Sequence, residues 1–285
     1  MLSILITSYD YNCLAFVTEL HRQAEKFPVP TEILVAGGGN FVMENRQISN
    51  LKGAKFIEVD EPGRAYLCSC LVRSARYERL IFIGCDAAII HSDFLKRYLV
   101  NYRNKNEVLC GGFAYDKPMP SPLFSLNWNY GARRKERTHL FSSFNFLIDK
   151  SVYTKLFLDK NLPWINYNMP VHDLLMGDLL QENGIEIRRI DNNLYRLNLL
   201  KNDDYLKEIR ANIEQLAPFL DQVKTESHLL HLYKKSKLNY TIYFVPILSK
   251  LFGKYIERNL LGPRPHLGFF YFYELAYLCE VIRQK

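Results

Sequence analysis

The chain has 285 residues, with 37 Lys and Arg against 30 Asp and Glu, and 48% of its residues are hydrophobic. This composition excludes a wholly disordered chain, a collagen-like repeat and a small disulfide scaffold. At roughly 100–200 residues per domain, the length allows one large domain or one domain with a C-terminal appendage. The six cysteines include no C-x-x-C pair and lie in or beside apolar runs, which indicates buried free thiols in a reducing compartment.

The N-terminal segment, MLSILIT, predicts a buried strand rather than a signal peptide, because it lacks a basic region and a small-residue cleavage site. The sequence contains no run of about 20 apolar residues, so we expect no helix that spans a membrane. Both features lead us to expect a cytoplasmic protein.

Strands and helices alternate over the first third of the chain. Short apolar runs bounded by polar residues predict strands at 2–7, 32–36, 55–59 and 80–84. Apolar residues at three- and four-residue spacing predict helices at 14–26 and 64–76. The run LIFIG at 80–84 is apolar throughout, as in a central strand that is covered on both faces. The alternation therefore indicates an α/β fold with a mostly parallel sheet flanked by helices.

Later in the chain the pattern is less regular. It predicts helices at 93–101 and 173–182, an extended segment at 140–148, and strands at 108–113 and 185–190. Residues 114–138 are rich in Pro, Asn and Arg without periodicity, which predicts a long functional or mobile loop. From residue 203 onward the spacing is helical. We therefore divide the chain into an α/β domain at 1–200 and a helical C-terminal region at 201–285.

Polar residues follow the predicted strands, and ligands of open α/β sheets bind beyond these strand ends. The stretches are Ser8-Tyr9-Asp10, Gly37-Gly38-Gly39-Asn40, 60–64 and Gly84-Cys85-Asp86. A dinucleotide fingerprint would need glycine at position 42, which is Val42, so that motif is absent. Asp86 follows an all-apolar strand, where a carboxylate must be solvated, paired or bound to a cation. A metal ligand and a cap of the next segment are equal alternatives for it.

This order of elements resembles the family 2 glycosyltransferases, which have the GT-A fold and use nucleotide sugars. LSILITSYD at 2–10 is similar to the family's opening strand and turn, and EILVAGGGN is similar to its second strand. The stretch at 63–86 resembles the helix and strand that lead into the D-x-D motif. FNFLIDKSVY at 144–153 resembles the acceptor-side strand, and VHDLL at 171–175 resembles the E-D motif.

Three positions depart from the family pattern. Gly37 stands where the family usually has an aspartate that binds the nucleoside base. Gly84 occupies the first position of D-x-D, which leaves Asp86 as its one carboxylate. His172 replaces the glutamate that precedes the catalytic aspartate, Asp173 in this chain.

The resemblance implies transfer of a sugar from a nucleotide-sugar donor to a saccharide or lipid-linked acceptor, with inversion, in polysaccharide biosynthesis. Asp173 would be the catalytic base, and Asp86 would hold a divalent cation, Mn or Mg, as Lewis acid. The implied donor-binding residues are Ser8, Tyr9, Asp10, Gly37, Arg64, Cys85 and Asp86, and the implied acceptor-side residues are Asn145 and His172. The alternative is an inactive GT-A relative that acts as a binding or scaffold subunit, because two family carboxylates are missing.

The C-terminal residues 228–285 combine nine Lys and Arg with three Glu and twelve aromatic residues. Basic amphipathic segments bind anionic membrane surfaces, so we expect peripheral association with the inner face of the membrane. Alternatively, these aromatics pack onto the main domain or onto a second subunit in a homo-oligomer. A net charge of +7 is modest and no fold for base readout is recognised, so no nucleic acid is expected as a partner.

Overall fold

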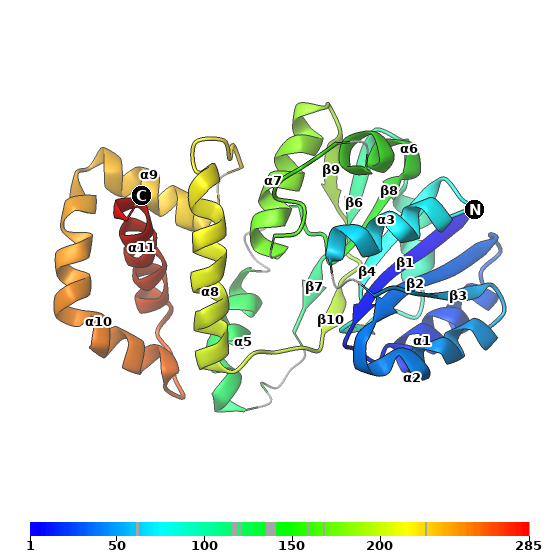
Figure 1. The fold of residues 1–285 in the computed structure, drawn as a ribbon, viewed down its shortest axis with the longest axis horizontal. Helices are drawn as coiled ribbons and strands as arrows, with labels where there is room; N and C mark the ends of the chain where they lie inside the picture. Colours follow the sequence, from blue (N-terminus) through cyan, green and yellow to red (C-terminus); the bar gives the residue numbers. More distant parts are fainter. Residues whose placement is uncertain are drawn as a thin grey trace. The chain divides into compact units, whose positions relative to one another are not determined.

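The structure is a computed structural model in which the chain forms two compact units (Figure 1). It describes residues 1–60, 63–115, 119, 121–134, 141–158, 160–167, 169–225 and 227–284. The first unit consists of Met1–Ala114 and His139–Leu197, and the second consists of Tyr115–Thr138 and Asn198–Lys285. Residues 115–138 therefore group with the C-terminal helices, although they come much earlier in the chain.

A seven-stranded sheet in the order β3-β2-β1-β4-β8-β6-β9 forms the centre of the first unit. Its strands are β1 (Leu2–Tyr9), β2 (Thr31–Gly38), β3 (Ala54–Glu58), β4 (Arg79–Gly84), β6 (Glu107–Cys110), β8 (Asn145–Asp149) and β9 (Glu186–Arg189). β8 is antiparallel to its neighbours β4 and β6, whereas the other neighbours pair in parallel. The mostly parallel sheet confirms the predicted α/β class.

A second sheet of three strands lies in the same unit, in the order β5-β10-β7. These strands are β5 (Ala87–Ile89), β7 (Phe113–Ala114) and β10 (Leu194–Arg196). The single strand predicted at 108–113 is therefore wrong, because β6 ends at Cys110 and β7 starts at Phe113. Gly112 separates the two with φ +73°, a left-handed backbone conformation that glycine adopts without strain.

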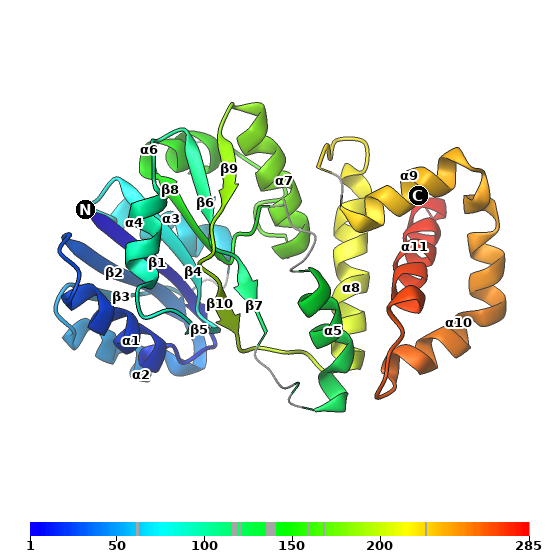
Figure 2. The same cartoon turned by 180° about the vertical axis from the view of Figure 1, so that it is seen from behind.

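Helices cover both faces of the large sheet. α3 (Arg64–Ser74) and α6 (Lys150–Tyr153) lie over one face (Figure 1), and α1 (Leu14–Glu25) and α4 (Phe94–Asn101) lie over the other (Figure 2). The core under α1 and α4 contains Ile4 and Ile6 of β1 together with Val17, Phe94 and Tyr98. Alternate strand residues point to opposite faces, so this core uses every second residue of β1. The short α2 (Val42–Arg46), flanked by 3₁₀ turns, follows β2.

Two segments differ from their predictions. The long loop predicted at 114–138 contains a 3₁₀ turn at Pro122–Phe124 and the helix α5 (Ser125–Arg134), while residues 116–118, 120 and 135–138 lie outside the described residues. The Ser121 hydroxyl caps this turn by accepting a hydrogen bond from the Leu123 N–H. α7 (Met169–Glu182) begins four residues before the predicted start. Its first turn contains Pro170, which is tolerated there because backbone N–H groups of a first turn have no partner within the helix. Asp173 therefore lies in the second turn of α7 rather than at its start.

The second unit is helical. Besides α5 it contains α8 (Asn202–Leu216), α9 (His228–Leu238), α10 (Val245–Leu261) and α11 (Leu267–Arg283), with 3₁₀ turns at Ala217–Phe219 and Thr241–Tyr243. α11 packs on α8, α9 and α10. Phe270 of α11 is fully buried, with its ring centroid 4.8 Å from that of Tyr130 and 6.0 Å from that of Tyr205. The helical prediction for the C-terminal region is confirmed over its described residues.

Candidate functional site at the strand ends of the first unit

The ends of β1, β2 and β4 bring the first group of predicted site residues together. The strand register places Ser8 beside Gly37, and Thr7 beside Gly84. The buried Ser8 hydroxyl donates to the Tyr11 carbonyl at 2.8 Å. Asp10 has φ +52°, and its Oδ1 accepts a hydrogen bond from the Asn40 N–H at 2.8 Å. Asp10 thus joins the loops after β1 and β2, and aspartate tolerates this left-handed backbone better than most residues.

Neighbouring atoms fill the space beside Gly37 and Gly84, the two glycines at positions where the resemblance leads us to expect carboxylates. A Cβ atom on Gly37 would lie 1.9 Å from the carbonyl oxygen of Ser8, which belongs to the backbone of β1. A Cβ atom on Gly84 would lie 2.5 Å from Cε2 of Phe144. Real Cβ atoms do not approach other heavy atoms this closely, so neither position accepts an aspartate unless its surroundings move. Glycine at these two positions is therefore required by the packing.

Asp86 is paired with an arginine that the sequence did not indicate. Arg196 Nε donates to Asp86 Oδ2 at 3.2 Å, and the two side chains are 24% and 15% exposed. The Leu197 N–H donates to the Asp86 carbonyl at 2.8 Å, and β10 pairs Arg196 with Ala87 of β5. The small sheet therefore holds the guanidinium beside the carboxylate, and it explains how Asp86 is tolerated after an apolar strand.

The residues around Asp86 do not fit a divalent cation. Cys85 beside it is half-buried, and desolvation, followed by the charges of Asp86 and Cys13, raises the pKa of its thiol to about 12. The thiol is therefore protonated near neutral pH. Within the described ranges no group of three or more His, Cys, Asp and Glu side chains could hold a metal ion. One carboxylate that already faces a guanidinium is a poor cage for Mn or Mg, which argues against the predicted metal ligand.

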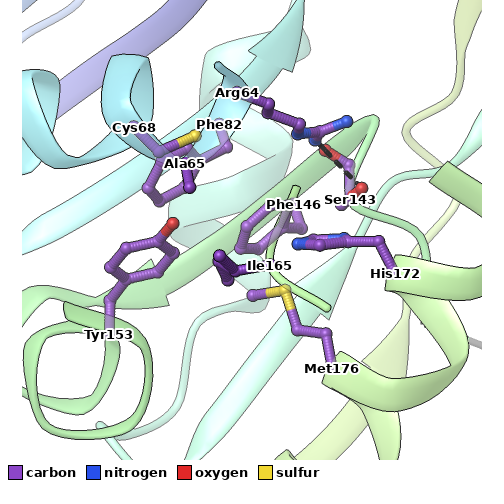
Figure 3. Close-up of a pocket in the computed structure, with 10 residues that line it drawn as sticks. All are labelled: Arg64, Ala65, Cys68, Phe82, Ser143, Phe146, Tyr153, Ile165, His172 and Met176. Carbon is purple, nitrogen blue, oxygen red and sulfur yellow. Dashed lines mark hydrogen bonds between the residues drawn. The ribbon is translucent and has the colours of Figure 1, made fainter. Parts of the chain in front are cut away.

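Ser143 joins a second group of residues in the same unit (Figure 3). Nη2 of Arg64, the first residue of α3, donates to the Ser143 carbonyl at 3.0 Å and to its hydroxyl at 2.9 Å. The Ser143 N–H in turn donates to Asp173 Oδ1 at 3.1 Å. Two residues predicted separately, Arg64 and Asp173, are thus connected through one buried serine, for which the sequence carried no signal.

Asp173 and His172 lie side by side on α7, and both are buried. Asp173 is 7% exposed, and its Oδ1 is 3.5 Å from His172 Nδ1. Its position in the second turn of α7 argues against a role that only complements the helix dipole, because that effect falls off within the first turn. A buried carboxylate held by a backbone N–H is fixed in orientation, which a general base requires.

His172 is neutral at neutral pH. Burial of its ring is the largest effect, and it lowers the pKa of the imidazole below the ordinary value of 6.5. The Asp173 carboxylate raises this pKa, while the positive charge of Arg64 lowers it further, and burial prevails. The imidazole packs edge-on against Trp164, with ring centroids 5.8 Å apart. The neutral ring therefore places little positive charge beside Asp173.

A small pocket opens beside this second group. Arg64, Ser143 and His172 form its polar side, while Phe82, Phe146 and Tyr153 form its apolar side (Figure 3). The volume open to the centre of a water molecule is about 10 Å³, which is room for about one water. A sugar ring does not fit in this space, so the pocket by itself is not a sugar site.

Asn145 lies apart from this group. Its side chain is fully buried, and its Oδ1 accepts a hydrogen bond from the Tyr98 hydroxyl at 2.6 Å. Its Nδ2 donates to the carbonyls of Gly112 and Asn192, at 3.1 Å and 2.8 Å. Tyr98 belongs to α4, so Asn145 faces the side of the sheet opposite α3. These contacts indicate a structural role, and the geometry gives no support to a place on the acceptor side.

The consecutive residues Ser143 and Phe144 link the two groups. Ser143 contacts Arg64 and Asp173, whereas the Phe144 carbonyl accepts a hydrogen bond from the Gly84 N–H at 2.8 Å. The Arg196 guanidinium lies over the Phe144 ring, 5.8 Å from its centroid. The strand-end group around Asp86 and the buried group around Asp173 therefore meet at the entry of β8.

No protein-family model and no curated protein sequence matches this chain. The fold is similar to that of residues 1–349 of TarS from S. aureus, at 14% identity and a TM-score of 0.51, over 99% of this chain and 90% of that chain. It is also similar to a mannosyltransferase from Pyrobaculum calidifontis in complex with GDP-Man and Mn2+, at 12% identity and a TM-score of 0.59, over 100% and 86% of the two chains.

A third similar structure is glucosyl-3-phosphoglycerate synthase from Mycobacterium tuberculosis in complex with Mn2+, UDP and phosphoglyceric acid. It is 14% identical, with a TM-score of 0.53, over 80% of each chain. At these identities the likeness establishes the fold, and the predicted GT-A-like architecture is confirmed.

Proposed function

We propose that this protein is a glycosyltransferase that moves a sugar from a nucleotide-sugar donor to a saccharide or lipid-linked acceptor, with inversion, in polysaccharide biosynthesis. The observation that carries the proposal is the contact of Ser143 with both Arg64 and Asp173. It joins a cation suited to phosphate and a fixed carboxylate in one site of a GT-A-like fold. The similar mannosyltransferase binds GDP-Man and the similar synthase binds UDP, which supports a nucleotide-linked donor.

Asp173 is the general base in this proposal. The acceptor hydroxyl transfers its proton to the carboxylate while its oxygen attacks the anomeric carbon of the donor sugar. The bond between that carbon and the phosphate oxygen breaks, and the electron pair leaves with the nucleoside diphosphate. The Ser143 N–H holds Oδ1 at 3.1 Å, so Oδ2 is assigned to the acceptor proton. Asp173 is 7% exposed, so in this proposal the groups around it move aside when the acceptor binds.

Arginines balance the charge of the departing diphosphate in this proposal. Arg64 and Arg196 each contact the Ser143–Phe144 stretch, and a guanidinium binds phosphate oxygens through two parallel hydrogen bonds. Ser8, Tyr9 and Asp10 at the end of β1 are assigned to the nucleoside, with Gly37, Cys85 and Asp86 on the neighbouring strand ends. No step is assigned to a metal ion, because the residues around Asp86 do not fit one.

A second function is favoured by the two filled glycine positions. The carbonyl of Ser8 and the ring of Phe144 occupy the space that family carboxylates would need. An inactive GT-A relative that binds a saccharide or a partner chain would retain the fold without these groups. Arg64, Ser143 and Asp173 would then have a structural role alone.

Donor turnover tests the proposal against this alternative. Purified protein is incubated with a panel of UDP-, GDP- and CMP-sugars, and both thermal stabilisation and release of free nucleotide are followed. An active enzyme is expected to be stabilised by one donor and to hydrolyse it slowly without acceptor. Stabilisation without nucleotide release, also after addition of saccharide acceptors, would support the binding subunit. The absence of any stabilisation would contradict the glycosyltransferase.

A further inference from the structure

The second unit exposes an apolar face on α10. The face consists of Phe244, which precedes the helix, and Ile247, Leu248, Leu251, Phe252 and Tyr255, and it is named here the α10 face. The spacing of these six residues places them on one side of an α-helix. Leu251 is 70% exposed and Tyr255 is 64% exposed. The face is therefore presented to solvent by the described part of the chain.

The opposite side of α10 accounts for its attachment to the unit. Val245, Ile256 and Leu260 are buried, and α10 packs on α11. α11 itself is turned inward, with Phe270 fully buried and the Tyr273 hydroxyl accepting a hydrogen bond from Arg210 of α8. The expectation that the aromatic residues of 228–285 contribute to a membrane surface is therefore wrong for Phe270, and the contact of Tyr273 gives it no support. The alternative of packing within the chain holds for these two residues, and the α10 face is left outside.

The exposure of these apolar residues indicates that the α10 face is a binding surface. Scattered apolar side chains are ordinary on protein surfaces, but large contiguous apolar patches mark binding surfaces. The segment before α10 also exposes large side chains: Leu238 at the end of α9, and Tyr240 and Tyr243 in the turn that follows, are each more than two-thirds exposed. Tyr240 has φ +58°, a conformation that costs a bulky residue energy. Tyr240 is therefore exposed to solvent although both its apolar ring and its backbone conformation carry a cost.

The positive charge around the α10 face indicates that its partner is anionic. Residues 234–264 contain seven Lys and Arg but one acidic residue, Glu257, whose Oε1 accepts a hydrogen bond from Arg210 at 2.8 Å. Lys250 and Lys254 are exposed on α10, and three exposed lysines lie near the end of α9. A second copy of this chain on the same face would bring like charges together, which opposes self-association. An anionic lipid surface attracts the lysines through its headgroup phosphates and accommodates the apolar side chains among its acyl chains.

We propose that the α10 face binds the surface of an anionic phospholipid membrane. The helix lies in the plane of the interface, with the α10 face among the acyl chains near the headgroups and the lysines at the phosphates. Tyr240 and Tyr243 suit the headgroup level, because each has an apolar ring and a polar hydroxyl. Among the described helices none has the length and apolar character needed to cross a bilayer. The inference does not depend on the proposed glycosyl transfer.

Sedimentation with vesicles tests the proposal on the full chain. We expect binding to vesicles of phosphatidylcholine that contain phosphatidylglycerol, weaker binding without the anionic lipid, and loss of binding at high salt. Lys250→Gln with Lys254→Gln is expected to lower the partition coefficient roughly thirtyfold. Leu251→Gln is expected to lower it about tenfold, because the leucine no longer gains from leaving water. Val100→Gln is the matched control, since Val100 is 73% exposed on α4 of the other unit.

Insertion and self-association have separate readouts. In Leu251→Trp the added tryptophan should be quenched by brominated acyl chains, over and above the signal of the wild-type protein. Light scattering without lipid reports the oligomeric state. A dimer that Leu251→Gln dissociates would overturn the proposal in favour of a second copy. Equal binding to neutral and anionic vesicles, or equal loss of binding in Val100→Gln, would also overturn it.

Discussion

A Cβ atom on Gly84 would lie 2.5 Å from Cε2 of Phe144. The first position of the expected D-x-D motif is therefore closed by an aromatic ring, which also lies beneath the guanidinium of Arg196. The closed glycine position and the Arg196–Asp86 pair therefore meet at the Phe144 ring. This relationship leads to the first two predictions.

Gly84→Ala should destabilise the protein by about 1–3 kcal/mol, because the added methyl overlaps the Phe144 ring in a packed core. Phe144→Leu should relieve part of that cost, so the two changes together should cost less than their sum. Urea unfolding of the wild type, the two single variants and the double variant measures this coupling. Gly253→Ala in α10 is the control, because its nearest neighbour would be 3.9 Å away, and it should raise stability by about 0.5–1 kcal/mol. If the stability changes of Gly84→Ala and Phe144→Leu simply add, the Phe144 ring does not occupy the space beside Gly84.

Arg196→Gln should abolish stabilisation of the protein by the nucleoside diphosphate of its donor. The wild-type stabilisation should persist when divalent cations are chelated, since a guanidinium and not a metal ion faces Asp86. Thermal shift with and without EDTA measures both effects. Arg97→Gln is a suitable control, because Arg97 has similar exposure but pairs with Asp93 beside α4. Stabilisation that depends on Mn2+ and survives Arg196→Gln would assign the diphosphate to a metal instead.

Asp173→Asn should lower the rate of sugar transfer by about 10²–10⁴-fold while leaving donor affinity within a few-fold. The amide oxygen still accepts the Ser143 N–H, so the mutant should fold and should unfold at a similar temperature. Transfer rate, donor affinity and melting temperature are compared with those of Glu182→Gln, an exposed change at the end of the same helix. A mutant that transfers sugar at the wild-type rate would exclude Asp173 as the base.

The buried imidazole of His172 should make the protein less stable in weak acid. Its pKa is lowered in the folded state, so the unfolded chain takes up this proton at a higher pH than the native chain does. The contribution of neutral His172 to the free energy of unfolding should therefore be fully present above the ordinary pKa of 6.5. It should be lost as the pH falls from there toward the lowered pKa of the folded state. The slope is limited to about 1.4 kcal/mol per pH unit for one proton.

Urea unfolding between about pH 5 and 7 measures this effect. His172→Gln should flatten the slope, because the glutamine does not titrate. Val100→Gln changes an exposed side chain without a titratable group and should leave the slope as it is in the wild type. An unchanged slope in His172→Gln would show that other groups, such as the carboxylates that pair in the fold, determine the acid sensitivity.

Some site residues could be predicted from the sequence around them, and others depend on residues far away in the chain. Ser8, Asp10 and Asp86 were predicted at strand ends, and they lie there because an apolar run followed by polar residues specifies where a strand stops. Arg196 is 110 positions from Asp86, and Ser143 is 79 positions from Arg64. Such pairs depend on strand register and on the small sheet, which no local pattern describes. Asn145 looked like a site residue by motif alone, but its register turns the side chain into the core.

The sequence by itself determined the α/β class, the positions of the first four strands along the chain and the helical character of the C-terminal region. Each follows from short-range periodicity, because burial of one face imposes a repeat of two on strands and of about 3.6 on helices. Only the tertiary structure decided that α11 turns inward while α10 faces outward, and that Asp86 meets an arginine. Both α10 and α11 are rich in apolar residues, so competition for the same core, rather than local preference, selects which of them is covered.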